Sequence, residues 1–371
     1  MLTDRYDPLK GEMYQIMDKD GGLVGEDPNL PEELLRQMYW WMLYGRMADE
    51  KAIKLQRQGR LGTYAPGQGQ EAAHAGPALA MGKDDWLFPS FRELTAYMIR
   101  GVPYEYNLMY FMGDPRSNRV PEGSNSLPIF VPVGTQVPIA AGAAFALKMK
   151  KKRDAVLCYM GDGATSEGDF HEGLNFAGVF SSPVVYIIQN NQWAISVPRS
   201  KQTASRTLAQ KALAYGIPGL LVDGNDVLAM YLAAKEALER AKGGGGPTLI
   251  EAYTFRLMMH TTADDASRYR SEEEVRYWKD RDPIKRMRSY LQKRSIWSEG
   301  WEKELVRRAE TMIKEAVEKA ESVPPLKPED LFLNMFSDMP DNLQDQLDLL
   351  QYYIETREIE EEAPVIRGGF P

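Results

Sequence analysis

Two short polar segments near the middle of the chain directly follow apolar runs, and their residue types suit a cation. They are Gly161-Asp162-Gly163-Ala164-Thr165 after the run 155–160 and Gln189-Asn190-Asn191-Gln192-Trp193 after the run 184–188. Twenty-six residues separate Gly163 from Asn190, which is room for one helix and the next strand. If the two runs are adjacent parallel strands, Asp162 and Asn191 meet at the same edge of the sheet.

The pairing of these segments predicts a magnesium site beside an anion. A carboxylate and an amide oxygen are hard ligands, and magnesium takes few protein ligands and completes its shell with phosphate and water. Gly161 and Gly163 allow backbone N–H groups to approach an anion, and a helix beginning near Glu167 adds its positive end. A lone Gly-Asp-Gly is most often a turn. Its combination with Asn190-Asn191 after a second apolar run favours the site.

The elements that must position these residues alternate along the chain. Helical stretches separate short β-branched runs at 156–159, 184–188, 220–222 and 249–255. Strands with continuous apolar runs are typically buried on both faces. The alternation with helices therefore predicts an α/β fold with a doubly wound parallel sheet.

Three regions are expected. They are an N-terminal arm over residues 1–30, the α/β domain with its helical segments over 31–325, and a helical C-terminal tail packing on partner subunits over 326–371. Helical spacing predicts an amphipathic helix from Pro31 to about Gln58. Ser271 and Glu274 have capping-box spacing and predict the start of a later helix.

The composition excludes several classes of protein. A net charge of -8 over 371 residues argues against binding to nucleic acid or to an anionic membrane. No stretch approaches the ~20 apolar residues of a membrane span, and the first ten residues do not resemble a signal peptide, so we expect a cytoplasmic location. Cys158 is the only cysteine, which excludes an intrachain disulfide, and its apolar surroundings predict a buried, unreactive side chain.

The paired segments resemble the thiamine diphosphate signature of the 2-oxoacid dehydrogenase family. In that family the Asp, the second Asn and the backbone carbonyl two residues later hold Mg²⁺, which implies Asp162, Asn191 and Trp193 here. The Gly and Ala that follow the Asp correspond to Gly163 and Ala164. The resemblance implies that the backbone amides of these two residues bind the diphosphate.

Four further segments resemble the family's alpha subunits, in the same order along the chain. Gly59 to Ala72 resembles the substrate-side loop, Ser90-Phe91-Arg92 the diphosphate-binding segment, Val131 to Gln136 the loop under the aminopyrimidine, and Arg256 to Arg270 the loop closing the active-site mouth. The resemblance implies catalytic roles for His260 and Tyr64. It also implies cofactor contacts by Phe91, Arg92, Val131, Val133 and His260.

Three departures from the family pattern bear on these roles. Phe91 replaces the usual Tyr and loses a hydroxyl near phosphate, and Thr63 replaces a bulky residue and could enlarge the substrate pocket. Met258-Met259 replaces a Gly-containing pair and could stiffen the closing loop before His260. The predicted magnesium site is unaffected by all three.

The resemblance also implies a reaction and partners. The expected activity is oxidative decarboxylation of a small 2-oxoacid with transfer of the acyl group to the lipoyl arm of a dihydrolipoyl acyltransferase core. The chain is long enough for only one α/β domain of this kind. No carboxylate in it stands out as the glutamate that protonates the cofactor. We therefore expect a beta subunit to supply it, in an assembly of two alpha and two beta chains. Pyruvate is the preferred substrate, with a branched-chain 2-oxoacid (3-methyl-2-oxobutanoate type) as the alternative.

Two other classes of protein remain as rivals. A nicotinamide-dependent dehydrogenase also has a doubly wound sheet, but Gly161 to Ser166 lacks the third glycine of G-x-G-x-x-G and places a carboxylate where pyrophosphate would approach. A non-catalytic scaffold is the second rival, because the C-terminal third is charged and amphipathic.

Overall fold

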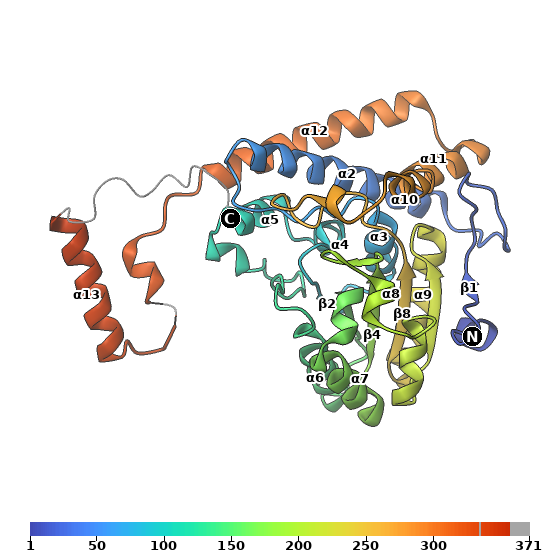
Figure 1. Cartoon of the computed structure of the whole chain (residues 1–371), viewed down its shortest axis with the longest axis horizontal. Coiled ribbons are helices and arrows are strands. Elements are labelled where there is room, and N and C mark those ends of the chain that lie inside the picture. Colours follow the sequence, from blue (N-terminus) through green and yellow to red (C-terminus); the bar gives the residue numbers. More distant parts are fainter. Residues whose placement is uncertain (334, 357–371) are drawn as a thin grey trace. The chain divides into compact units, whose positions relative to one another are not determined.

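The computed structural model describes residues 1–333 and 335–356, and the chain divides into two compact units, Met1–Glu321 and Ser322–Pro371. Within the described residues, the first unit contains a sheet of six parallel strands in the order β1-β7-β8-β4-β3-β2 (Figure 1). The strands are β1 (Met13–Tyr14), β2 (Trp86–Phe88), β3 (Val156–Gly161), β4 (Val184–Asn190), β7 (Gly219–Asp223) and β8 (Thr248–Tyr253). Helices flank the sheet, so the predicted α/β class with a parallel sheet is confirmed.

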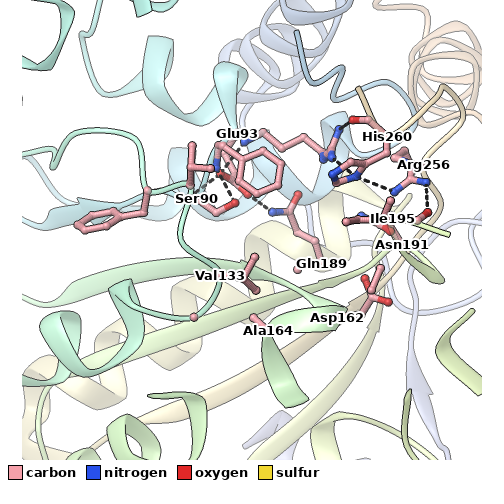
Figure 2. A pocket seen from close by; sticks show the side chains of 18 of the residues that line it. Ser90, Glu93, Val133, Asp162, Ala164, Gln189, Asn191, Ile195, Arg256 and His260 are labelled. Atoms are coloured by element: carbon pink, nitrogen blue, oxygen red, sulfur yellow. Dashed lines mark hydrogen bonds between the residues drawn. The ribbon is translucent and has the colours of Figure 1, made fainter. Parts of the chain in front are cut away.

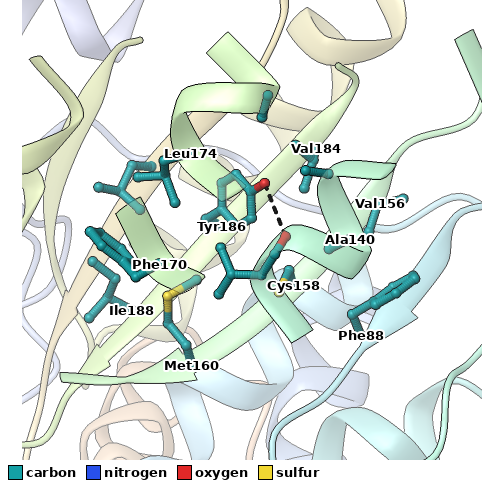
Figure 3. Close-up of a cluster of buried hydrophobic side chains, with 14 of the residues drawn as sticks. Phe88, Ala140, Val156, Cys158, Met160, Phe170, Leu174, Val184, Tyr186 and Ile188 are labelled. Carbon is teal, nitrogen blue, oxygen red and sulfur yellow. Dashed lines mark hydrogen bonds between the residues drawn. The ribbon is translucent and has the colours of Figure 1, made fainter. Parts of the chain in front are cut away.

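Helices cover both faces of this sheet. On one face, α6 (Gln136–Met149) and α7 (Gly168–Phe180) pack on β3 and β4, where Cys158, Met160, Tyr186 and Ile188 belong to a continuous apolar core (Figure 3). On the other face lie α3 (Glu71–Ala80) and α9 (Val227–Arg240). The hydroxyl of Tyr159 on β3 donates to the His74 carbonyl of α3 at 2.8 Å. The strands are therefore buried on both sides, as their apolar runs predict, and Cys158 is buried.

The helix predicted from Pro31 to about Gln58 is α2 (Glu32–Arg57). One face of α2 is buried and includes Asp49, a charged residue among apolar neighbours. The helix ends before Gly59, whose φ of +73° is a left-handed conformation that favours glycine. This glycine opens the loop that the sequence assigns to the substrate side.

Part of the first thirty residues, expected as an arm, lies against the edge of the sheet. Met13 and Tyr14 pair with Leu221 and Val222 of β7, and one oxygen of the buried Asp226 accepts from the backbone N–H groups of Ile16 and Met17, at 2.7 and 2.6 Å. The other oxygen caps the start of α9. A two-residue strand has too few positions to leave an alternating pattern, so the sequence gives no signal for β1.

The remaining α-helices and strands of the first unit are short or lie after the sheet. Before β8 they are α1 (Leu2–Arg5), α4 (Leu94–Ile99), α5 (Tyr104–Phe111), β5 (Trp193–Ala194), β6 (Val197–Pro198) and α8 (Arg199–Gln202), and after it α10 (Glu272–Lys279), α11 (Pro283–Lys293) and α12 (Glu299–Glu321). The Ser271 hydroxyl accepts from the Glu274 N–H at 3.1 Å at the start of α10, as the spacing predicts.

The second unit contains α13 (Asp341–Thr356) and a short helical turn at Pro328–Leu331. The Gln351 side chain donates to Glu329 at 2.9 Å and ties these two elements together. The tail expected over residues 326–371 falls in this unit, and its positions 334 and 357–371 lie outside the described residues. Among the residues that are described, no helix combines the length and the apolar character needed to cross a membrane.

Candidate active site

A cavity of about 430 Å³ lies at the carboxyl ends of β3 and β4 (Figure 2). The predicted site residues that line it are Phe91, Arg92, Val131, Val133, Asp162, Gly163, Ala164, Asn191, Trp193 and His260. Gly161 pairs with Gln189 in the register of β3 and β4, which brings the segments following the two strands together. The sequence spacing therefore predicts this juxtaposition correctly.

The strand end of the cavity, formed by Asp162, Gly163, Ala164 and Asn191, contains a buried carboxylate and a buried amide. Asp162 accepts a hydrogen bond from the Gln202 side chain at 2.9 Å, and the Asn191 amide nitrogen donates to Gln70 at 3.1 Å. Burial raises the pKa of Asp162, although hydrogen bonds and the charge of Arg256 act in the opposite direction. A cation at this carboxylate would offset the cost of burying its charge.

Gly163 holds its place because a side chain there would collide with the hairpin β5–β6. A Cβ at this position would lie 2.8 Å from the Ala194 Cβ. A short 3-10 helix, Asp162–Ser166, connects the strand to α7, which begins at Gly168 one residue after the predicted Glu167. The backbone at 162–166 can therefore approach a bound anion closely, near the positive end of α7.

The lid end of the cavity, formed by Arg92, Arg256 and His260, brings two cations to one imidazole. Arg92 Nη2 lies 3.2 Å and Arg256 Nη1 lies 3.3 Å from His260 Nδ1, and Figure 2 shows the Arg256 and His260 side chains together above Asp162. Guanidinium groups only donate, so Nδ1 must accept and the proton of the neutral ring is on Nε2. Burial and the two arginine charges lower the pKa of His260 to about 3.

Arg256 connects the two ends of the cavity. It donates from Nη1 to the Trp193 carbonyl at 3.2 Å and from Nη2 to the Ile195 carbonyl at 2.8 Å. The Trp193 carbonyl is one of the predicted magnesium ligands, and its two lone pairs allow it to accept from Arg256 and to bind a metal ion. Trp193 itself is held by the indole N–H, which donates to Glu274 at 3.3 Å.

The predicted residues for the rest of the cofactor lie at the open side of the cavity. The Phe91 ring meets His260 edge-on with centroids 6.1 Å apart, and the Arg92 guanidinium lies 5.1 Å from the Phe91 ring centre. Val131 and Val133 are each 50% exposed, which is unusual for valine beside a cavity. This edge of the site is suited to a further surface that covers the two valines.

Tyr64 is the predicted catalytic residue that the structure does not bring into this cavity. Its side chain is 1% exposed, and its hydroxyl donates to Asp49 of α2 at 2.7 Å. Its backbone instead pairs with Thr262 of the closing loop, at 2.9 and 3.0 Å. Tyr64 therefore contacts the site's loops and not the cavity itself.

Sequence reasoning did not assign roles to Glu93, Gln70 and Gln136, which also line the cavity. Glu93 accepts from the Ser90 N–H at 2.8 Å and from the Gln189 side chain. The Ser-x-x-Glu spacing of residues 90–93 is typical of a helix start and could have indicated this local use of the carboxylate. Gln70 and Gln136 lie in the segments Gly59–Ala72 and Val131–Gln136 that resemble family loops, but the resemblance implied no role for either side chain.

The oxygen ligands at the strand end suit a magnesium ion. No cluster of three or more His, Cys, Asp or Glu side chains that could hold a metal occurs in the part of the chain that the structure describes. The predicted set does not depend on such a cluster, because it combines one carboxylate with an amide and a carbonyl oxygen. Magnesium accepts few protein ligands of this hard type and takes the remainder from phosphate and water.

Known proteins similar to this chain are consistent with the geometry. Residues 39–329 match the family described as dehydrogenase E1 component. The chain is 44% identical over 343 residues to the pyruvate dehydrogenase E1 component subunit alpha of Staphylococcus aureus, covering 92% of this chain and 93% of that protein. The protein of the same name from Staphylococcus epidermidis is 43% identical with the same coverage.

Proposed function

The chain belongs to the dehydrogenase E1 component family, and we propose that it is the alpha subunit of a pyruvate dehydrogenase. The family is thiamine diphosphate-dependent, so the chain is a component of a 2-oxoacid dehydrogenase and not a nicotinamide-binding protein or a scaffold. The observation that carries the proposal is that Asp162, Asn191, Arg92 and His260 line the same cavity. These residues are far apart in sequence.

The cofactor site uses both ends of this cavity. When bound, thiamine diphosphate supplies the carbanion that attacks the 2-oxo carbon and holds the electrons released with carbon dioxide. Asp162, Asn191 and the Trp193 carbonyl would hold Mg²⁺, while Arg92 and the amides of Gly163 and Ala164 would bind the diphosphate. Phe91, Val131 and Val133 would line the thiamine portion.

His260 would act as a neutral group in this site. Its pKa of about 3 leaves the imidazole uncharged at neutral pH, with Nε2 as the donor. A neutral donor can hydrogen-bond to a phosphate oxygen or to an incoming substrate group without adding a third positive charge beside Arg92 and Arg256. This fits the predicted place of His260 at the mouth that the lipoyl arm must enter.

A beta subunit would complete the site. Among the described residues, the acidic side chains that line the cavity are Glu93, Asp162 and Glu167. Glu93 accepts hydrogen bonds from Ser90 and Gln189, Asp162 is the proposed metal ligand, and Glu167 is exposed. The glutamate that protonates the cofactor would therefore come from the partner, which would also cover Val131 and Val133.

The assembly we propose contains two alpha and two beta subunits and delivers the acyl group to a lipoylated dihydrolipoyl acyltransferase core. A cytoplasmic location also remains a prediction from the sequence. The proposed assembly follows from the resemblance of the chain to its family, and the isolated alpha chain is accordingly expected to lack decarboxylase activity.

Substrate choice is tested with the reconstituted alpha and beta chains. We expect kcat/KM for pyruvate to exceed that for 3-methyl-2-oxobutanoate at least about tenfold, because two additional methyl groups must fit the same pocket. A preference for the branched substrate would instead assign the chain to branched-chain 2-oxoacid dehydrogenases. Loss of activity without thiamine diphosphate or Mg²⁺ checks the cofactor assignment independently of the substrate.

A further inference from the structure

A buried carboxylate outside the cavity holds the loop that supports the lid end. Asp49 of α2 is 4% exposed, and its Oδ1 accepts from the Tyr64 hydroxyl at 2.7 Å and from the Gly67 N–H at 3.0 Å. Burying a carboxylate costs free energy unless its charge is paired or hydrogen-bonded. The position of Asp49 therefore needs an explanation other than packing.

The loop that Asp49 holds contacts the lid end directly. Arg92 Nη1 donates to the Pro66 carbonyl at 2.6 Å, between the two residues that Asp49 anchors. The same loop forms backbone hydrogen bonds with the closing loop, from Thr262 to Tyr64 at 2.9 Å and from Leu257 to Gln68 at 3.0 Å. The position of Asp49 is thus transmitted to Arg92 and to the segment that carries His260.

A second connection runs through a small cavity between Asp49 and Arg92. Its volume is about 10 Å³, and Asp49, His74, Arg92 and Thr95 are among the residues that line it. This is room for one water molecule. Asp49 Oδ2 accepts no hydrogen bond from the described residues, so a water here could donate to it.

We propose that Asp49 is a positioning residue, which fixes Arg92 for diphosphate through the Tyr64–Gly67 loop and one internal water. This inference rests on the proposed role of Arg92 in binding thiamine diphosphate. Tyr64 then acts through Asp49, which accounts for its burial away from the cavity. The carboxylate charge also favours the charged form of Arg92, whose pKa is lowered to about 10 chiefly by burial.

The ionisation of Asp49 gives the proposal a pH dependence. Burial raises the pKa of Asp49 to about 6, against the hydrogen bonds from Tyr64 and Gly67. The titratable and charged groups around it are Tyr64, Tyr104, Glu71, Arg46, His74 and Arg92. Above pH 6 the carboxylate is charged and supports Arg92, and below pH 6 protonation removes that support.

The test measures the Kd of thiamine diphosphate with the reconstituted alpha–beta enzyme in saturating Mg²⁺. Asp49→Asn keeps the shape and an acceptor oxygen but removes the charge. At pH 7.5 we expect it to weaken binding about tenfold, the lower end of the loss for groups that orient binding residues. At saturating cofactor its kcat should return to within about twofold of wild type, because positioning of the diphosphate affects binding first.

The matched control is Glu50→Gln, which neutralises the next, exposed residue of the same helix. It should leave Kd within about twofold of wild type. The ratio of the Asp49→Asn Kd to the wild-type Kd should fall towards one between pH 7.5 and pH 5.5. Equal Kd values for Asp49→Asn and Glu50→Gln at pH 7.5, or a ratio that does not change with pH, would overturn the proposal.

Two further variants separate the possible failures. If Arg92→Gln leaves Kd unchanged, the proposed role of Arg92 is wrong; if it weakens binding while Asp49→Asn does not, only the positioning role of Asp49 fails. Tyr64→Phe, which removes the hydroxyl donor alone, should weaken binding about threefold and serves if Asp49→Asn does not assemble. Wild-type affinity for Tyr64→Phe in that case would contradict the proposal.

Discussion

The strand end and the lid end of the cavity carry opposite charges, yet burial is the main cause of the pKa shift at both. It raises the pKa of Asp162 at the strand end and lowers the pKa values of Arg92 and His260 at the lid end. An acid and a base respond in opposite directions because burial disfavours the charged form of each. The opposite charges already near each end, Arg256 for Asp162 and Glu93 for Arg92, offset this cost of burial only in part.

A magnesium diphosphate would offset the remaining cost at both ends together. The cation would neutralise Asp162, and the phosphate oxygens would accept from Arg92 and from the backbone at Gly163 and Ala164. Arg256 links the two ends of the cavity, because it contacts the Trp193 carbonyl at one end and His260 at the other. The site is therefore suited to a ligand that carries both positive and negative charge.

The largest effect is expected at the strand end. Asp162→Asn removes the charged metal ligand, and loss of one partner of a buried charge pair costs about 3–5 kcal/mol. Binding of thiamine diphosphate in Mg²⁺ should weaken at least about 100-fold, since 1.4 kcal/mol is a factor of ten. Isothermal titration of the reconstituted enzyme with the cofactor measures this change.

Glu172→Gln is the control for this variant, because it neutralises an exposed carboxylate on α7 that does not line the cavity. It should change cofactor affinity less than about twofold. If Asp162→Asn binds as well as Glu172→Gln does, the Gly-Asp-Gly segment is only a turn, and the contrast between the two ends has no functional meaning.

A smaller effect is expected at the lid end, where two arginines supply the positive charge. Arg92→Gln should weaken cofactor binding about 10- to 100-fold, because a hydrogen bond to a charged group contributes about 1.5–3 kcal/mol. It also removes one of the charges that lower the pKa of His260, so that pKa should rise towards 6.5. Activity should then fall at acid pH, where the protonated ring can no longer accept from Arg256.

The pH dependence of kcat/KM for pyruvate between pH 5.5 and 8 measures this second change. Wild type should show no titration of His260 in this range, because its pKa is about 3. Arg119→Gln, at an exposed arginine outside the cavity, is the control and should reproduce the wild-type profile. An Arg92→Gln profile identical to wild type would mean that burial and Arg256 keep the pKa of His260 below this range without Arg92.

The two ends also differ in how far the sequence predicts them. At the strand end the chain runs from a buried strand directly into the site. The apolar runs and the spacing of Asp162 and Asn191 were therefore sufficient to predict that these two residues lie together. The positions of β3, β4, β7 and β8, of α7 and of the start of α10 followed from the same local patterns, although the strand bounds differ by one to two residues from those predicted. The weak edge strands β1 and β2 did not, because two or three residues carry no periodic signal.

At the lid end the decisive contacts are long-range. Family resemblance placed Arg92 and His260 at the site, but nothing in the local sequence indicates that Arg256 contacts Trp193 or that Tyr64 turns towards Asp49. These contacts depend on how loops pack after the sheet has formed. Loop positions are therefore the part of the site for which a structure was needed.

The smallest effect concerns the helix that follows the closing loop. Ser271→Ala removes the side-chain cap of α10, which typically costs about 1 kcal/mol of stability. Cofactor affinity should change less than about twofold, because the cap lies beyond the residues that contact the cavity. Urea denaturation and cofactor titration measure the two quantities on the same protein.

Ser289→Ala, which removes a hydroxyl within α11, is the matched control and should not lower stability, because alanine is the better helix former there. We expect the loss of stability in Ser271→Ala to leave cofactor affinity unchanged. Arg256 and the loop held by Asp49 fix the lid end independently of α10. If Ser271→Ala instead weakens cofactor binding tenfold, the lid end depends on the helix behind it. In that case Trp193, whose indole donates to Glu274 of α10, is the contact through which the effect would pass.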